Sequence, residues 1–145
     1  MYLDRLQEQV SQGDLFDSLP LAHVDWHTPP QPSLRHVRAV LLTFNCEYDK
    51  PNCKSVLVAE VKSLSLVPEN LRGNVRRNRV ASAFFLSGHE RMEESYVDFR
   101  YVSTLDKRIV EEASVAGQRI LSLDEDTGLA LQEQLYQFFG YGRKG

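Results

Sequence analysis

The chain has 145 residues, of which 42% are hydrophobic and 26% are charged, and its formal net charge is −3. This size and composition are typical of one globular domain, residues 1–145, and they exclude a wholly disordered chain. The acidic balance excludes a general attraction to nucleic acid, so that a nucleic-acid site requires a local basic patch.

The sequence also sets the expected cellular context. No apolar run approaches the roughly 20 residues that a membrane-spanning helix needs, and the first residues lack the pattern of a signal peptide. The two cysteines, Cys46 and Cys53, are too few for a disulfide scaffold and are expected to be thiols. We therefore expect a cytoplasmic protein that makes no membrane contact.

The first part of the chain is predicted to contain a helix, a strand and a long loop. Apolar residues recur at helical spacing over residues 1–12, which predicts an N-terminal helix. Residues 13–19 are predicted to form a strand. Residues 23–35 hold three of the six prolines and are predicted to form a loop, because consecutive prolines prevent helix formation and remove backbone donors. Long ordered loops often cover a site or contact a partner.

The middle of the chain is predicted to consist mainly of strands. Nearly continuous apolar runs predict buried strands over residues 37–43 and 55–63. An irregular, arginine-rich connection over residues 67–79 leads to a further strand over residues 80–87. Alternation with a period of two predicts another strand over residues 95–103.

Two helices are predicted to close the chain, over residues 105–116 and 123–139. Ser122 and Glu125 form a capping-box pattern before the second helix, and its apolar residues form one stripe. Together the elements predict an α+β domain, a small antiparallel β-barrel or curled sheet of five to seven strands over residues 13–104 with helices at both ends. The C-terminal helices occupy residues 105–140.

Six short motifs follow one another along the chain: GDLF (13–16), RAVLLT (38–43), a polar turn (45–52), VLVAEVK (56–62), VSTLDK (102–107) and LSLDE (121–125). Their order and spacing resemble those of the MazF/PemK toxin family over residues 13–140. The resemblance implies an SH3-like barrel that forms a homodimer. It also implies a metal-independent endoribonuclease that acts on single-stranded RNA and is restrained by an antitoxin.

The resemblance also implies catalytic residues. The family's catalytic arginine precedes an apolar strand, and Arg38 stands at the matching position. The family's catalytic threonine ends the next strand, where this chain has Lys62, with Ser63 one residue later. A shift of one residue in a strand turns a side chain to the opposite face, so the second catalytic group is either Lys62 or Ser63.

The chemistry of RNA cleavage gives each of these residues a role. Arg38 would stabilise the charged phosphorane, because a guanidinium binds phosphate oxygens in pairs. Lys62 would add positive charge, and His36 would act as a general acid or base, because the reference pKa of histidine is about 6.5. The competing interpretation is that Arg38 and His36 are solvated residues at a strand edge.

A second group of residues is a candidate for binding nucleic acid. Its members are basic or aromatic, and they are Trp26, Arg35, Arg72, Arg76, Arg77 and Arg79. Clustered arginines suit phosphate contacts along a single strand, and a tryptophan can stack on a base. The alternatives are a solvated loop balanced by nearby glutamates such as Glu93 and Glu94, and a tryptophan that anchors a partner or packs its own loop down.

The remaining polar residues are expected to be structural. The spacing of Cys46 and Cys53 does not match a known zinc site, so we expect no metal and no cofactor. Cys46 is expected to be buried at the end of a core strand. In the strand over 95–103, Asp98 and Arg100 share a face opposite the apolar residues, which predicts a surface ion pair.

Two functions of different classes therefore remain open. The first is an RNA-cleaving, toxin-like enzyme that uses Arg38 with Lys62 or Ser63. The second is a catalytically inactive barrel that binds nucleic acid or a protein partner, as part of a larger assembly, through the proline-rich and arginine-rich segments. Convergence of Arg38, Lys62 and Ser63 on one concave face would favour the enzyme.

Overall fold

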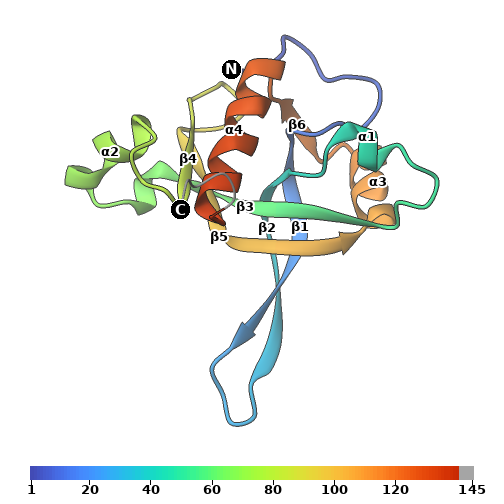
Figure 1. Ribbon diagram of the computed structural model, residues 1–145, viewed down its shortest axis with the longest axis horizontal. Coiled ribbons are helices and arrows are strands. Elements are labelled where there is room, and N and C mark those ends of the chain that lie inside the picture. Colours follow the sequence, from blue (N-terminus) through green and yellow to red (C-terminus); the bar gives the residue numbers. More distant parts are fainter. Residues whose placement is uncertain (141–145) are drawn as a thin grey trace.

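The computed structural model describes residues 1–140 and shows an α+β fold built on one antiparallel sheet (Figure 1). The six strands lie in the order β4-β5-β3-β2-β1-β6. They are β1 (Asp14–Asp25), β2 (Gln31–Leu41), β3 (Ser55–Ser63), β4 (Ala83–Leu86), β5 (Ser95–Asp106) and β6 (Arg119–Ser122). The helices are α1 (Asn45–Tyr48), α2 (Arg72–Arg76), α3 (Lys107–Val115) and α4 (Glu125–Phe138), with 3-10 turns at Leu64–Leu66 and Glu69–Leu71. The predicted α+β class is confirmed.

The sheet is open, so the expectation of a closed barrel is wrong. Its two edges are the four-residue strands β4 and β6, which do not pair with each other. Other groups cover both edges: the side chains of Asn78 and Gln134 bond to the backbone of β4, and the amide of Leu3 donates to the carbonyl of Ser122 in β6. Because both edges are covered, neither edge strand needs a further strand beside it, and the sheet does not need to close into a barrel.

The N-terminal segment is not the predicted helix. Residues 1–12 contain no helical turn and run past β6, where Tyr2 forms a bridge with Leu123. The guanidinium of Arg119 donates to the backbone carbonyls of Gln7 (2.8 Å) and Gln9 (3.1 Å). These carbonyls belong to the bonds that a helix would use internally, so tertiary contacts outweigh the weak preference of a short helical pattern.

Residues 23–35, predicted to be a loop, instead continue β1 and β2 as a long hairpin, and only residues 26–30 form its turn. Figure 1 shows this hairpin projecting from the rest of the fold, and residues 20–36 are called the arm from here on. Pro20 and Pro32 lie in strands that carry no third strand beside them here. Proline is tolerated there because no neighbour requires its missing N–H.

Apolar residues of alternating strand positions form two cores, one on each face of the sheet. The core under α4 contains Leu15, Val40, Ala59, Val61, Val97, Phe99, Leu131 and Leu135, with Phe138 packed against it. The core on the other face contains Phe16, Ala39, Leu41, Val58, Leu105 and, from α3 and α1, Val110 and Tyr48. The predicted packing of Leu131, Leu135 and Phe138 on the sheet is confirmed. Within residues 1–140, no helix is long and apolar enough to cross a membrane.

Cys46 is exposed in α1, contrary to the expectation of a buried position. The strand β2 ends at Leu41, and the chain then turns into α1 instead of carrying its alternation on to residue 46. Tyr48 is the buried residue of this helix. One turn of helix presents few residues to the core, and here the large aromatic side chain occupies that position.

We expect the substitution Leu131→Ala to lower the free energy of unfolding by about 2–5 kcal/mol, because it leaves a cavity in a fully buried position. The matched control is Leu129→Ala on the same helix, where the side chain is 58% exposed and a change below about 1 kcal/mol is expected. Urea unfolding curves measure both. Equal losses in the two variants would contradict the orientation of α4.

Candidate functional site

Arg38 lies on β2 and is held between two carboxylates. One guanidinium nitrogen is 2.9 Å from Oδ1 of Asp17 on β1, and the other is 3.2 Å from Oε2 of Glu93, which precedes β5. The Nε atom is buried and has no hydrogen-bond partner among residues 1–140. The carboxylates of Asp17 and Glu93 therefore occupy the guanidinium N–H groups of Arg38 that would bind a phosphate.

Ser63 reaches the same neighbourhood through Glu93. Both residues line a cavity of about 470 Å³, and the Ser63 hydroxyl lies 2.8 Å from that of Ser65. The pKa of Glu93 is lowered by a hydrogen bond from its own backbone amide, and further by Arg38 and Ser63. Arg38 and Ser63 thus both lie at the carboxylate of Glu93. The sequence suggested Glu93 only as a counter-charge for the arginine-rich connection over residues 67–79.

Lys62 contacts a different set of groups on the opposite face of β3. Its ammonium nitrogen is 3.1 Å from Asp98 and 3.4 Å from Glu60, and it lies 3.8 Å from the ring centroid of Tyr101. Neighbouring residues of a strand point to opposite faces. Arg38 and Lys62 therefore bind separate carboxylates, and of the two expected partners of Arg38 only Ser63 lies near it.

The contacts of Lys62 belong to a buried ion network. Glu60 and Asp98 lie directly opposite each other on β3 and β5, and both are buried. Arg35 is 2.8 Å from Glu60 and Arg100 is 3.0 Å from Asp98. Burial raises the pKa of Asp98, but the hydrogen bonds from Arg100 and Lys62 outweigh burial, so this pKa lies below its ordinary value. The predicted pairing of Asp98 with Arg100 is confirmed, although its carboxylate is buried rather than at the surface.

Tyr101 of β5 also belongs to this network, although strict alternation along β5 predicts it on the face opposite Asp98. The pairing of β5 with β3 contains a register shift: Asp98 faces Glu60, but the next residue of β3, Ala59, faces Val102. Such a bulge re-aims the side chains beside it, and Tyr101 lies under Lys62 and 5.6 Å from the guanidinium carbon of Arg35. Arg35, a predicted nucleic-acid contact, is therefore already engaged by Glu60 and Tyr101.

In this network two carboxylates face three cations, so the charges of the network are largely paired with one another. No group of three or more metal-binding side chains occurs in residues 1–140.

The arginine loop is divided between bound and free side chains. Arg72 donates to the backbone carbonyls of Val67 and Ser65, and Arg76 forms two hydrogen bonds with Glu94, at 2.9 and 3.0 Å. The alternative in which nearby glutamates balance the arginines thus describes Arg76, whereas Arg72 is bound by backbone carbonyls. Arg77 and Arg79 are exposed, and neither forms an ion pair within the described chain.

The arm has one apolar face. Ala22 pairs with Leu34 and Val24 pairs with Pro32, and residues paired across two strands share a face. Val24 and Leu34 are each 65% exposed, and Trp26 at the turn is 90% exposed, so the alternative in which this tryptophan packs its own loop down is wrong. His36 is exposed on the same strand and pairs with Pro20 in the register.

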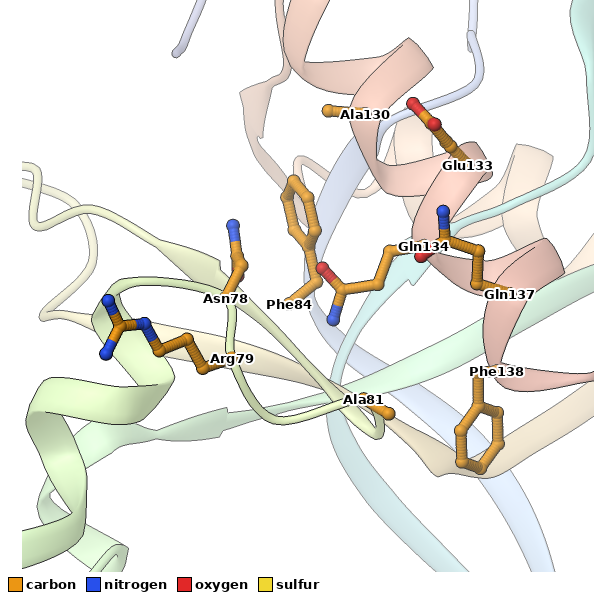
Figure 2. A pocket seen from close by; sticks show the side chains of 9 residues that line it. All are labelled: Asn78, Arg79, Ala81, Phe84, Ala130, Glu133, Gln134, Gln137 and Phe138. Carbon is orange, nitrogen blue, oxygen red and sulfur yellow. The ribbon is translucent and has the colours of Figure 1, made fainter. Parts of the chain in front are cut away.

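A second cavity, of about 560 Å³, lies between the loop after α2 and the helix α4. Figure 2 shows Asn78 and Arg79 on one side, side chains of α4 on the other, and Phe84 between them. Its lining residues are Asn78, Arg79, Ala81, Phe84, Ala130, Glu133, Gln134, Gln137 and Phe138. We call this cavity the amide groove. Only Arg79 among these residues was predicted as a binding residue.

We expect Asp98→Asn to destabilise the fold by about 3 kcal/mol at neutral pH, because it leaves Lys62 and Arg100 without their shared counter-charge. The pKa of Asp98 is depressed by folding, so its contribution is present above about pH 4 and is lost as pH falls through the lower folded value. Urea unfolding across this pH range measures the effect.

The control for this variant is Glu47→Gln, which breaks an exposed ion pair with Lys50 and is expected to change stability by less than about 1 kcal/mol. The stability of Asp98→Asn should vary less with pH below pH 5 than that of the unmodified chain. An unchanged acid profile would mean that Asp98 does not stabilise the folded state.

Comparison with known proteins does not assign a family. No protein-family model matches the chain, and no curated protein matches it. The resemblance to the MazF/PemK toxins therefore stays a prediction from sequence.

Proposed function

We propose that this chain is a non-catalytic binding module that docks onto a protein partner through the arm. The observation that carries the proposal is the apolar face of the arm, formed by Ala22, Val24, Pro32 and Leu34 with Trp26 at its tip. Single exposed apolar residues are ordinary, but a contiguous apolar patch on a projecting element is typical of an interaction surface.

The geometry of the arm supports a docking role. Beyond residue 21 its side chains are half-buried or exposed, so it contributes little to either core of the domain. A two-stranded hairpin in water is marginally stable at best. Burying its apolar face against a partner would supply the stabilisation that the arm lacks alone.

The distribution of charge indicates the kind of partner. Asp25 and Arg35 belong to the pairs on the opposite face of the arm, together with Leu21 and Gln31. The pairs Ala22–Leu34 and Val24–Pro32 are uncharged, which suits an uncharged, apolar cleft on another protein, with an acceptor for the indole N–H of Trp26. Among the paired residues of this face, His36 opposite Pro20 is the one ionisable side chain, so nucleic acid is a poor match for it.

The arrangement at Arg38 supports a module without catalysis. Its guanidinium is neutralised by Asp17 and Glu93, and Lys62 lies in the network on the other face. A catalytic guanidinium must be free to bind the charge that develops in the transition state. Here that group serves to join β1, β2 and the start of β5.

To test the proposal, the partner is isolated with the full chain, purified, and bound again in a titration followed by fluorescence. Trp26 is the one tryptophan of the chain, so its emission reports burial of the arm tip directly. We expect a shift to shorter wavelength on binding, and a loss of affinity of about 30-fold or more for Trp26→Ser, as for a central interface tryptophan.

The matched control is Val115→Ser at the end of α3, where the side chain is 91% exposed and far from the arm in sequence. It should leave the affinity unchanged. A partner that binds Trp26→Ser as tightly as the unmodified chain would overturn the proposal. If the emission shifts when the pure protein is concentrated, and light scattering gives a dimer, then the partner is a second copy, in keeping with the predicted homodimer.

The second candidate function is the metal-independent endoribonuclease of a toxin that an antitoxin restrains, carried here by an open sheet. One observation favours it: Arg38 and Ser63 both meet the exposed carboxylate of Glu93. In that case Glu93 would accept the proton of a ribose 2′-hydroxyl, Arg38 would exchange Asp17 for the phosphorane, and the leaving 5′-oxygen would take a proton from solvent.

Incubation of the pure protein with mixed single-stranded RNA in a chelator distinguishes the two candidates. The binding module leaves the RNA intact. The enzyme would cut it, and both Arg38→Ala and Glu93→Gln would lower the rate by about 100-fold or more. Arg108→Ala removes a highly exposed arginine elsewhere and serves as the control for charge. Cutting that persists in all three variants would assign the activity to a contaminant.

A further inference from the structure

We infer that the amide groove is a nucleotide-binding site that takes the base between α4 and the loop at residues 78–81. The inference goes beyond the docking role of the arm and involves none of its residues. The groove measures about 560 Å³ and is partly open. Small-molecule sites typically occupy roughly 300–1,000 Å³, so a nucleotide fits this volume.

Two amide side chains in the groove are fixed by the backbone around β4. The Oδ1 atom of Asn78 accepts a hydrogen bond from the amide of Phe85 at 2.8 Å, which leaves the nitrogen of Asn78 free to donate. The Nε2 atom of Gln134 donates to the carbonyls of Val80 (3.2 Å) and Ala83 (2.7 Å), which leaves the Gln134 oxygen free to accept. The groove thus presents a positioned donor and a positioned acceptor.

This pattern matches the edge of a nucleobase. Each base carries donors beside acceptors on its edge, and carboxamide side chains pair with such edges. Gln137 adds a further amide and Glu133 a carboxylate acceptor for an amino group, both from α4 (Figure 2). Proteins that read unpaired bases combine contacts of this kind with an aromatic surface on which the base stacks.

The groove also supplies aromatic side chains and a charge. Phe84 lines it from β4, with 3% of its surface exposed, and the half-buried Phe138 lines it from α4. Arg79 is exposed, has no ion-pair partner within residues 1–140, and lines the same groove, so its guanidinium is available to a phosphate.

A peptide strand is a poor alternative occupant. Strand addition requires free backbone groups along the edge of a sheet. Asn78 and Gln134 already bond to the outward-facing groups of Phe85 and Ala83 at this edge. The groups that remain in the groove come from side chains, and they suit a small polar heterocycle.

The experiment is an NMR and calorimetric titration of the full chain with AMP, GMP and a single-stranded hexaribonucleotide. Inorganic phosphate serves as the probe for charge alone. We expect saturable binding of a nucleotide with shifts in residues of α4 and the loop at 78–81. The variants Arg79→Ala and Gln137→Ala are each expected to weaken binding about tenfold, by removing a hydrogen bond to the ligand.

The control is Arg77→Ala, which removes an exposed arginine from the same segment but outside the groove lining. It should weaken binding by less than about twofold, since only diffuse charge is lost. The thermal melts of all three variants should match that of the unmodified chain, because the substituted side chains are exposed.

Three outcomes would overturn the inference: no saturable shift in the groove, equal losses for Arg77→Ala and Arg79→Ala, or phosphate binding as tight as nucleotide binding. Two outcomes support it and identify the source of the nucleotide. Tight binding of the hexaribonucleotide with weak binding of AMP and GMP indicates RNA, and comparable binding of all three indicates a free nucleotide. None of these outcomes depends on the arm, so the proposed docking function is judged separately.

Discussion

The buried carboxylates of Glu60 and Asp98 impose the constraint on which the arrangement of the central strands depends. Two acidic side chains facing each other across β3 and β5 are stable inside a protein only when cations lie beside them. Those cations come from Arg35 on β2, Lys62 on β3 and Arg100 on β5. The network therefore joins three strands at the base of the arm, and it sets the direction in which the arm leaves the sheet.

The same constraint gives Lys62 a role at the end of β3. Lys62 supplies charge to the network, and the bulge in β5 brings Tyr101 beneath it. Meanwhile Arg38 joins Asp17 to Glu93 on the other face. The polar residues of the central strands thus hold the sheet together, and the two proposed recognition sites, the arm and the amide groove, lie outside them.

Sequence patterns predicted the elements whose stability is local. The runs of β3 and β5 and the apolar stripe of α4 lie where periodicity placed them, because buried faces dictate those patterns. Features that depend on distant contacts were missed. Ser122 bonds Asp14 instead of capping α4, a role that Asp124 takes, and Arg119 holds the N-terminal segment extended. Proline content hid the arm, because a strand with one free edge tolerates proline. Of the candidate site residues, sequence placed Trp26 and Arg79 at accessible positions but could not reveal which carboxylates the other cations bind.

The length of the arm has a geometric consequence. Six strand residues beyond Leu19 extend roughly 20 Å at about 3.4 Å each. Figure 1 shows the arm directed away from the part of the fold that carries α2 and α4. A partner bound at the tip of the arm would therefore not contact the amide groove. On the two proposals made above, a larger partner at the tip of the arm and a small ligand in the amide groove would bind at the same time without touching each other.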